Sequence, residues 1–145
     1  MRIILSFLFL VFFYHANGQD NTGFYIQIDK KTNCPQEVRT FDNLAAFCVP
    51  QKPILDRSAF TSVGEIQVDH NKKRKHIDIY ISTKGMELLK TVVTSLPNAN
   101  LILIVDNKVV GILRNKDVVG RFIRVDSDLV SQQLEWIHDK LKPVP

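Results

Sequence analysis

Residues 100–114 read Asn-Leu-Ile-Leu-Ile-Val-Asp-Asn-Lys-Val-Val-Gly-Ile-Leu-Arg and are the most strongly patterned part of the chain. Two apolar runs that are rich in β-branched residues, 101–105 and 109–113, are separated by Asp106-Asn107-Lys108. Because Asn and Asp tolerate the positive φ that tight hairpin turns require, the pattern predicts a central β-hairpin. Its first run is apolar at five successive positions. Such a run favours a strand covered on both faces, or a central strand with one face partly covered.

Further strand-like segments lie on both sides of this hairpin. Residues 24–29 alternate between apolar and mixed positions and predict a first strand. Residues 65–70 and 75–82 predict a second hairpin, and residues 121–125 predict another strand. Since tight turns join most of these segments, the sheet is expected to be mainly antiparallel.

Two segments carry helical spacing. Residues 84–95 follow Ser82-Thr83, a good helix cap, and residues 128–141 follow Asp126 or Ser127 as the cap. The stripe of the first helix is Met86, Leu89 and Val93, with Leu88, Val92 and Leu96 alongside, and that of the second is Val130, Leu134, Ile137 and Leu141. The predicted fold class is therefore α+β: a mainly antiparallel sheet with two amphipathic helices on one face.

The two cysteines, Cys34 and Cys48, lie in a segment with no clear periodicity. Residues 30–56 contain several prolines and a short apolar patch, so we expect an irregular N-terminal segment containing one short helical turn or strand. In an exported chain, an even pair of cysteines favours a disulfide that ties this segment down. The alternatives are a reactive thiol or a metal site, but structural zinc usually has four ligands.

The first eighteen residues resemble a secretory signal peptide. Met1-Arg2 precedes a twelve-residue run, 3–14, that is apolar except for Ser6, and Ala16-Asn17-Gly18 offers small residues for cleavage after Gly18. The alternative is a membrane anchor, but the run is short of the ~20 residues needed to span a bilayer. We therefore expect an exported protein, periplasmic or extracellular, with a single α+β domain over residues 19–145 and no stable membrane span.

The net charge of the chain is small. Without Arg2, the 19 basic residues become 18 against 15 acidic residues, which gives a net charge of +3. This value favours solubility and does not indicate nucleic acid or an anionic membrane as a partner. Lys72, Lys73, Arg74 and Lys75 form one cationic run at the tip of the second hairpin. It is either a solvated loop tip, the preferred interpretation, or a binding surface.

No catalytic set can be named from the sequence. Carboxylates are scattered, the serines lie outside nucleophile-elbow patterns, and no glycine loop is suited to phosphate, so we predict no catalytic residue and no cofactor. His70 and His76 flank the cationic run and, with Asp69 and Asp78, suggest a weak alternative: a small secreted hydrolase or metal-binding protein. The nearby cations oppose a metal ion, so no metal ligand is predicted. His138 is expected on the surface.

Four segments carry a resemblance to a known family. They are Lys52-Pro-Ile-Leu55, residues 59–68, residues 77–89 with their Ser82-Thr83-Lys84-Gly85 helix entry, and the hairpin 101–110. Together, residues 50–141 resemble the head portion of the first periplasmic domain of the SecD/SecF protein-export subunits. Asn107 stands where that family typically has glycine, and the transmembrane helices of the export subunits have no counterpart here.

The resemblance implies a function as well as a fold. A head of this type is thought to contact emerging polypeptide, while the proton-driven part of the export machine lies in membrane helices. Together with the signal peptide and the absence of a catalytic set, the resemblance favours an exported, non-enzymatic module that binds protein, peptide or unfolded polypeptide. A purely structural envelope protein is a further alternative that the sequence does not distinguish from it.

Overall fold

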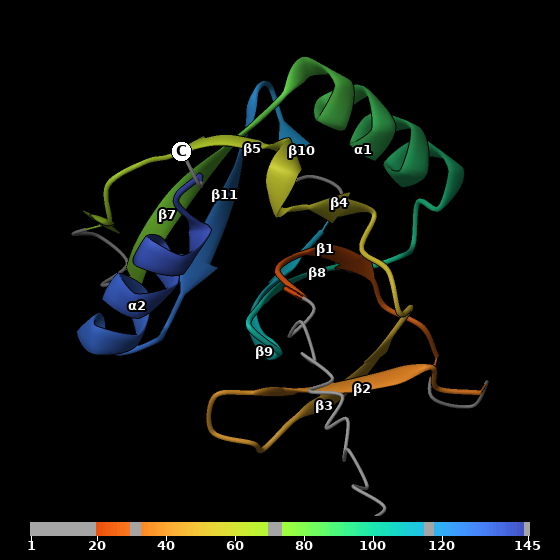
Figure 1. Ribbon diagram of the computed structural model, residues 1–145, viewed down its shortest axis with the longest axis horizontal. Helices are drawn as coiled ribbons and strands as arrows, with labels where there is room; N and C mark the ends of the chain where they lie inside the picture. The colour runs from red at the N-terminus through yellow and green to blue at the C-terminus, as the bar shows by residue number, and fades with distance from the viewer. Residues whose placement is uncertain (1–19, 30–32, 70–73, 115–117, 144–145) are drawn as a thin grey trace, which may run out of the picture.

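The computed structural model describes residues 20–29, 33–69, 74–114 and 118–143, which form two β-sheets and two helices (Figure 1). In spatial order, the first sheet contains β3 (Ala46–Val49), β2 (Gln36–Thr40), β9 (Lys108–Leu113), β8 (Leu101–Val105), β1 (Gly23–Ile26) and β4 (Leu55–Asp56). The second contains β10 (Val118–Val119), β11 (Phe122–Ser127), β7 (Arg74–Ile81) and β5 (Phe60–Val63), with β6 (Gln67–Asp69) also paired to β7. The helices are α1 (Thr83–Ser95) and α2 (Ser131–Leu141). The predicted α+β class is confirmed.

The predicted central hairpin is formed by β8 and β9. Asp106 and Asn107 make the turn, with φ angles of 49° and 64°, and Lys108 already pairs with Val105. Positive φ at both turn residues matches the right-handed twist of the two strands. All five residues of β8 are at most 1% exposed, which confirms that this strand is covered on both faces.

Two separate cores lie on the two faces of β8. The main core contains Leu101, Leu103 and Val105 together with apolar residues from the second sheet and both helices. The small core lies on the opposite face and consists of Tyr25, Val38, Val49, Ile102, Ile104 and Val109. Side chains alternate across a strand, so β8 connects the two cores by contributing alternate residues to each.

The first sheet closes on itself around the small core. After β1, the Ile28 N–H donates a hydrogen bond of 2.8 Å to the carbonyl of Cys48 in β3, the strand at the opposite edge of the sheet. The ring of β3, β2, β9, β8 and β1 is thereby completed. The bridge gives the outer edge of β3 a partner at Cys48, which shortens the free edge of the sheet there.

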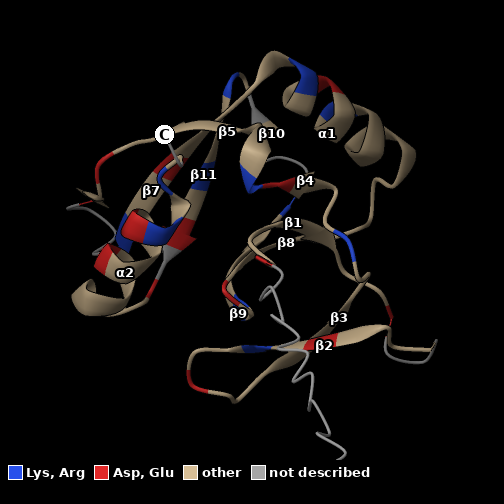
Figure 2. Cartoon of the chain, in the orientation of Figure 1, with Lys and Arg blue, Asp and Glu red and all other residues tan. Residues whose placement is uncertain are grey.

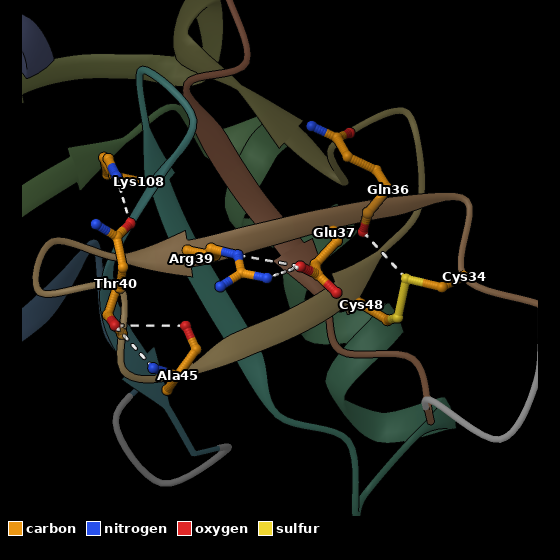
Figure 3. Close-up of polar contacts among 9 residues, drawn as sticks. Cys34, Gln36, Glu37, Arg39, Thr40, Ala45, Cys48 and Lys108 are labelled. Atoms are coloured by element: carbon orange, nitrogen blue, oxygen red, sulfur yellow. Dashed lines mark hydrogen bonds and ion pairs between the residues drawn. A yellow bond between two sulfur atoms is a disulfide. The ribbon is translucent and has the colours of Figure 1, made fainter.

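The predicted disulfide between Cys34 and Cys48 is present, with Cα atoms 5.5 Å apart (Figure 3). The expectation of an irregular segment around it is wrong for residues 36–49. β2 and β3 form an antiparallel hairpin, with Val38 opposite Phe47 and Arg39 opposite Ala46. Only Val38 is apolar among the five residues of β2, so the strand lacks the alternation that would have predicted it.

The sequence predicted one sheet, but the structure has two sheets, and β9 lies where they meet. The register of β8 and β9 shifts between Leu103 and Ile104, which indicates a β-bulge near Gly111. A Cβ atom at Gly111 would lie 2.7 Å from Cγ1 of Val125 in β11. Glycine therefore lets the two sheets approach closely at the irregular position of the strand.

Both helices pack into the main core, beside the inward-facing residues Ile77, Ile79 and Ile81 of β7. The helix residues buried in this hydrophobic core are Met86, Leu89, Leu134, Ile137 and Leu141. The Ser82 hydroxyl accepts a hydrogen bond of 3.2 Å from the Gly85 N–H, so the predicted cap of α1 is confirmed.

The predicted caps of α2 are wrong. β11 continues to Ser127, which pairs with Lys75, so the helix begins only at Ser131 and Val130 takes the capping position. Val130 is 63% exposed instead of lying in the buried stripe. Neither helix of the described ranges is long and apolar enough to cross a membrane. The predicted signal peptide, residues 1–18, lies outside the described residues.

Candidate functional site

The predicted second hairpin is confirmed, but only part of its cationic run lies within the described residues. β6 and β7 pair with Gln67 opposite His76, whereas Lys72 and Lys73 lie outside the described residues. Arg74 and Lys75 belong to β7 and reach toward the start of α2. The Arg74 Nε atom lies 3.4 Å from Asp128, and the Lys75 ammonium donates to the Ser131 hydroxyl. A binding role for the run stays a prediction.

The alternative metal site gains no support from the residues that can be placed. Nε2 of His76 lies 3.0 Å from the Gln67 side-chain oxygen, and Asp78 is held by Arg124. His70 lies outside the described residues. In the described part of the chain, no group of three or more His, Cys, Asp or Glu side chains is arranged to hold a metal ion.

His138 is buried, not on the surface as expected. It is 8% exposed, and its Nε2 atom has no hydrogen-bond partner within the described ranges. It follows Ile137 on α2, and both residues are buried. The sequence suggested a surface position because His138 lies outside the regular apolar stripe.

The outward face of the second sheet carries a pair of charges and a pair of rings. Asp78 and Arg124 are opposite one another on β7 and β11, and two guanidinium nitrogens donate hydrogen bonds of 2.8 Å to the two carboxylate oxygens. The Tyr80 and Phe122 rings lie 5.7 Å apart, and Arg124 also covers Phe122. The hydrogen bonds from Arg124 lower the pKa of Asp78, whereas partial burial acts in the opposite direction.

This ion pair predicts a pH-dependent contribution to stability. The folded-state pKa of Asp78 lies below its ordinary value of 3.8, so the contribution is present above about pH 4 and is lost as the pH falls through the folded pKa. Asp78→Asn should lower the free energy of unfolding by about 1 kcal/mol at pH 7, a value discounted because Arg124 is half exposed.

Urea denaturation at pH 7 and at about pH 2.5 checks this prediction. The difference between wild type and Asp78→Asn should shrink at the lower pH. Glu37→Gln is the matched control, because Glu37 and Arg39 form an ion pair exposed on both sides, and it should change stability by less than about 0.5 kcal/mol. An Asp78→Asn effect that is equal at both pH values would contradict the assignment.

An open groove of about 500 Å³ lies beside β9, and no sequence pattern indicated it. It is lined by residues 40–42 from the end of β2 and the β2–β3 turn, 109–112 from β9, and 126, 128–130 and 133 from the junction of β11 with α2. We call it the β9 groove. The Phe41 ring reaches across to Trp136 of α2 in an edge-to-face contact with ring centres 5.7 Å apart. The contact fixes the hairpin turn against the helix.

The β9 groove exposes part of a strand edge. The parallel pairing of β2 with β9 includes Arg39 with Lys108 and Thr40 with Val109 and then ends, while β9 continues to Leu113. Among the strands that the structure describes, none pairs with residues 110–113 on the side away from β8. Ile112, 49% exposed, lies in this region. The groove thus combines an available strand edge with apolar side chains.

The charge of the β9 groove is opposite in sign to that of the chain. Among the residues that the structure describes, its lining includes Asp42, Asp126 and Asp128 but no Lys, Arg or His, whereas the whole chain has a net charge of +4. Asp42 lies in the β2–β3 turn, and Asp126 and Asp128 lie at the junction of β11 with α2, where Figure 2 shows acidic positions in red. The Thr40 hydroxyl and the Leu44 N–H donate to Asp42 and lower its pKa, so this carboxylate is ionised at neutral pH.

Comparison with known proteins defines the fold class. No protein-family model matches the chain, and no curated protein sequence matches it. A solved structure does match: SecDF in its super-membrane-facing form, with a TM-score of 0.55 and 11% sequence identity over 84% of this chain. The chain has a SecD/F-like fold, which confirms the resemblance seen in the sequence at the level of fold. The match covers 18% of the SecDF chain.

Proposed function

We propose that this chain is an exported module that binds protein or unfolded polypeptide and has no catalytic activity of its own. The observation that carries the proposal is the β9 groove, where apolar side chains lie beside a strand edge without a partner in the described sheet. Proteins commonly bind extended segments by adding them to such an edge, with main-chain hydrogen bonds providing affinity.

The fold and the disulfide support the two other parts of the proposal. A SecD/F-like fold supports contact with polypeptide, because the resemblance in sequence implies a head that meets emerging chains. The Cys34–Cys48 disulfide supports a compartment outside the cytoplasm, since such bonds persist in oxidising surroundings. The predicted signal peptide is in agreement with that location.

Binding of a permanently unfolded protein tests the proposal. The probe is a reduced and carbamidomethylated protein, whose blocked cysteines carry no added charge, and its native form serves as the control. Isothermal titration calorimetry should show binding of the unfolded form with a dissociation constant on the order of 10–100 µM, as is typical of a small and transient interface. Weaker or no binding of the native form would indicate that extended chain is recognised.

Two outcomes would overturn the proposal. One is the absence of binding by either form at several hundred micromolar. The other is a stoichiometric, tightly bound metal ion in the purified protein, which would favour the alternative use of His70 and His76. Equal binding of both forms would support a protein-binding surface but would contradict recognition of extended chain.

A further inference from the structure

We infer that the β9 groove selects extended segments in which a lysine or arginine lies close to apolar residues, and that such a segment pairs with β9 as an added strand. The inference rests on the proposed function and specifies its ligand. Its basis is the coincidence, in one open groove, of three carboxylates, apolar side chains and the edge of β9.

The strand edge determines the shape of the ligand. β2 leaves β9 after Thr40, so an incoming segment can continue along β9 from the point where β2 departs. The volume of about 500 Å³ is within the usual range for small binding sites and suits a few residues rather than a folded domain. An extended backbone fits this space because it can satisfy the hydrogen-bonding groups along the edge.

The apolar part of the ligand follows from the groove lining. Ile112 of β9 and Val130 before α2 are 49% and 63% exposed, and both line the groove together with Phe41 of the hairpin turn. Side chains of an added strand alternate between two directions, so every second residue can contact these apolar groups. Covering them removes apolar surface from water, which favours binding.

The charged part of the ligand follows from the carboxylates. Asp42 comes from the β2–β3 turn, and Asp126 and Asp128 come from the junction of β11 with α2, so a cation in the groove is attracted by carboxylates of two segments. Arg74 already lies 3.4 Å from Asp128, but this ion pair is exposed on both partners. Among the described residues, Arg74 forms no ion pair with Asp42 or Asp126. An acidic segment would be repelled at the same place, so the groove should discriminate by charge.

Three peptides of equal length test the charge preference. They share one apolar pattern and carry Lys, Gln or Glu at the same two positions. Fluorescence anisotropy with the purified chain at about 50 mM salt should show the Lys peptide binding roughly tenfold more tightly than the Glu peptide, with the Gln peptide between them. At about 500 mM salt, the difference should shrink to roughly threefold or less, because salt screens exposed charges.

A double variant locates the preference in the groove. Asp42→Asn with Asp126→Asn removes two groove carboxylates while keeping side chains that accept hydrogen bonds, and it should abolish most of the preference for Lys. Glu65→Gln with Glu87→Gln is the matched control, since it removes two exposed charges outside the groove. The control should retain the preference. Thermal unfolding of each variant establishes that it is folded.

Backbone methylation tests the added strand. Two Lys peptides are methylated on alternate amide nitrogens, one set at odd and the other at even positions. Only one set can face β9, so one peptide should lose at least tenfold in affinity while the other stays within roughly threefold of the unmethylated peptide. Equal effects of the two methylations would overturn strand addition.

Failure of this inference is distinguishable from failure of the proposed function. If the three peptides bind equally, or if the groove variant keeps the preference for Lys, the inferred selectivity is wrong. Binding of the unfolded protein would still support the proposed function in that case. If neither the peptides nor the unfolded protein bind, both are wrong.

Discussion

Replacing Leu103 with alanine is expected to lower the free energy of unfolding by about 3–5 kcal/mol, the largest effect of any substitution considered for this chain. Leu103 is fully buried at the centre of β8 and belongs to the main core. Alanine removes the apolar contacts of the side chain and leaves a cavity that strands on either side of β8 cannot easily fill, because β8 pairs with both β1 and β9.

Urea denaturation monitored by circular dichroism measures this loss. Leu88→Ala is the matched control, because Leu88 is the same residue type but is 46% exposed on α1, and it should cost less than about 1 kcal/mol. Ile104→Ala should also lower the free energy of unfolding, because it leaves a cavity in the small core on the opposite face of β8. A loss of less than about 1 kcal/mol for Leu103→Ala would contradict the placement of β8 at the centre of the fold.

Reduction of the Cys34–Cys48 disulfide is expected to lower the free energy of unfolding by about 3 kcal/mol, the value for a closed segment of about 15 residues in the chain-entropy model. The bond joins the residues before β2 to β3, and Cys48 is also the residue that receives the hydrogen bond from Ile28. Breaking it releases the hairpin at the place where the first sheet closes, next to the small core.

Denaturation with and without a reductant gives the size of this effect, and mass measurement gives the oxidation state. The Cys34→Ala, Cys48→Ala double variant is the control for direct effects of the reductant, because its stability should not respond to the reductant. If wild-type protein that is demonstrably reduced unfolds at the same urea concentration as the oxidised form, the disulfide does not stabilise the hairpin.

Local patterns in the sequence were enough for much of this fold. The central hairpin and the Ser82 cap depend on residues close together in the chain, and their preferences for turn and cap geometry are strong. The disulfide followed from compartment and cysteine number. The β2–β3 hairpin was missed because its stability comes from tertiary contacts: its few apolar residues are buried by pairing with β9 and by closure of the sheet.

The candidate site could not be predicted for a related reason. The β9 groove is assembled from three segments around residues 40–42, 109–112 and 126–133, and none of them contains a motif. Its strand edge exists only because β2 leaves β9 after Thr40, which is a property of the sheet rather than of either strand. The cationic run at residues 72–75 is a feature of the sequence itself, whereas the groove exists only in the folded chain.

The most direct test of the central claim is a nuclear magnetic resonance titration of the isotopically labelled chain with the Lys peptide. Binding in the β9 groove predicts that the largest amide shifts occur at Gly111, Ile112 and Val130, with smaller shifts on the outward face of the second sheet. Shifts concentrated around Tyr80 and Phe122, with the groove amides unchanged, would contradict the account.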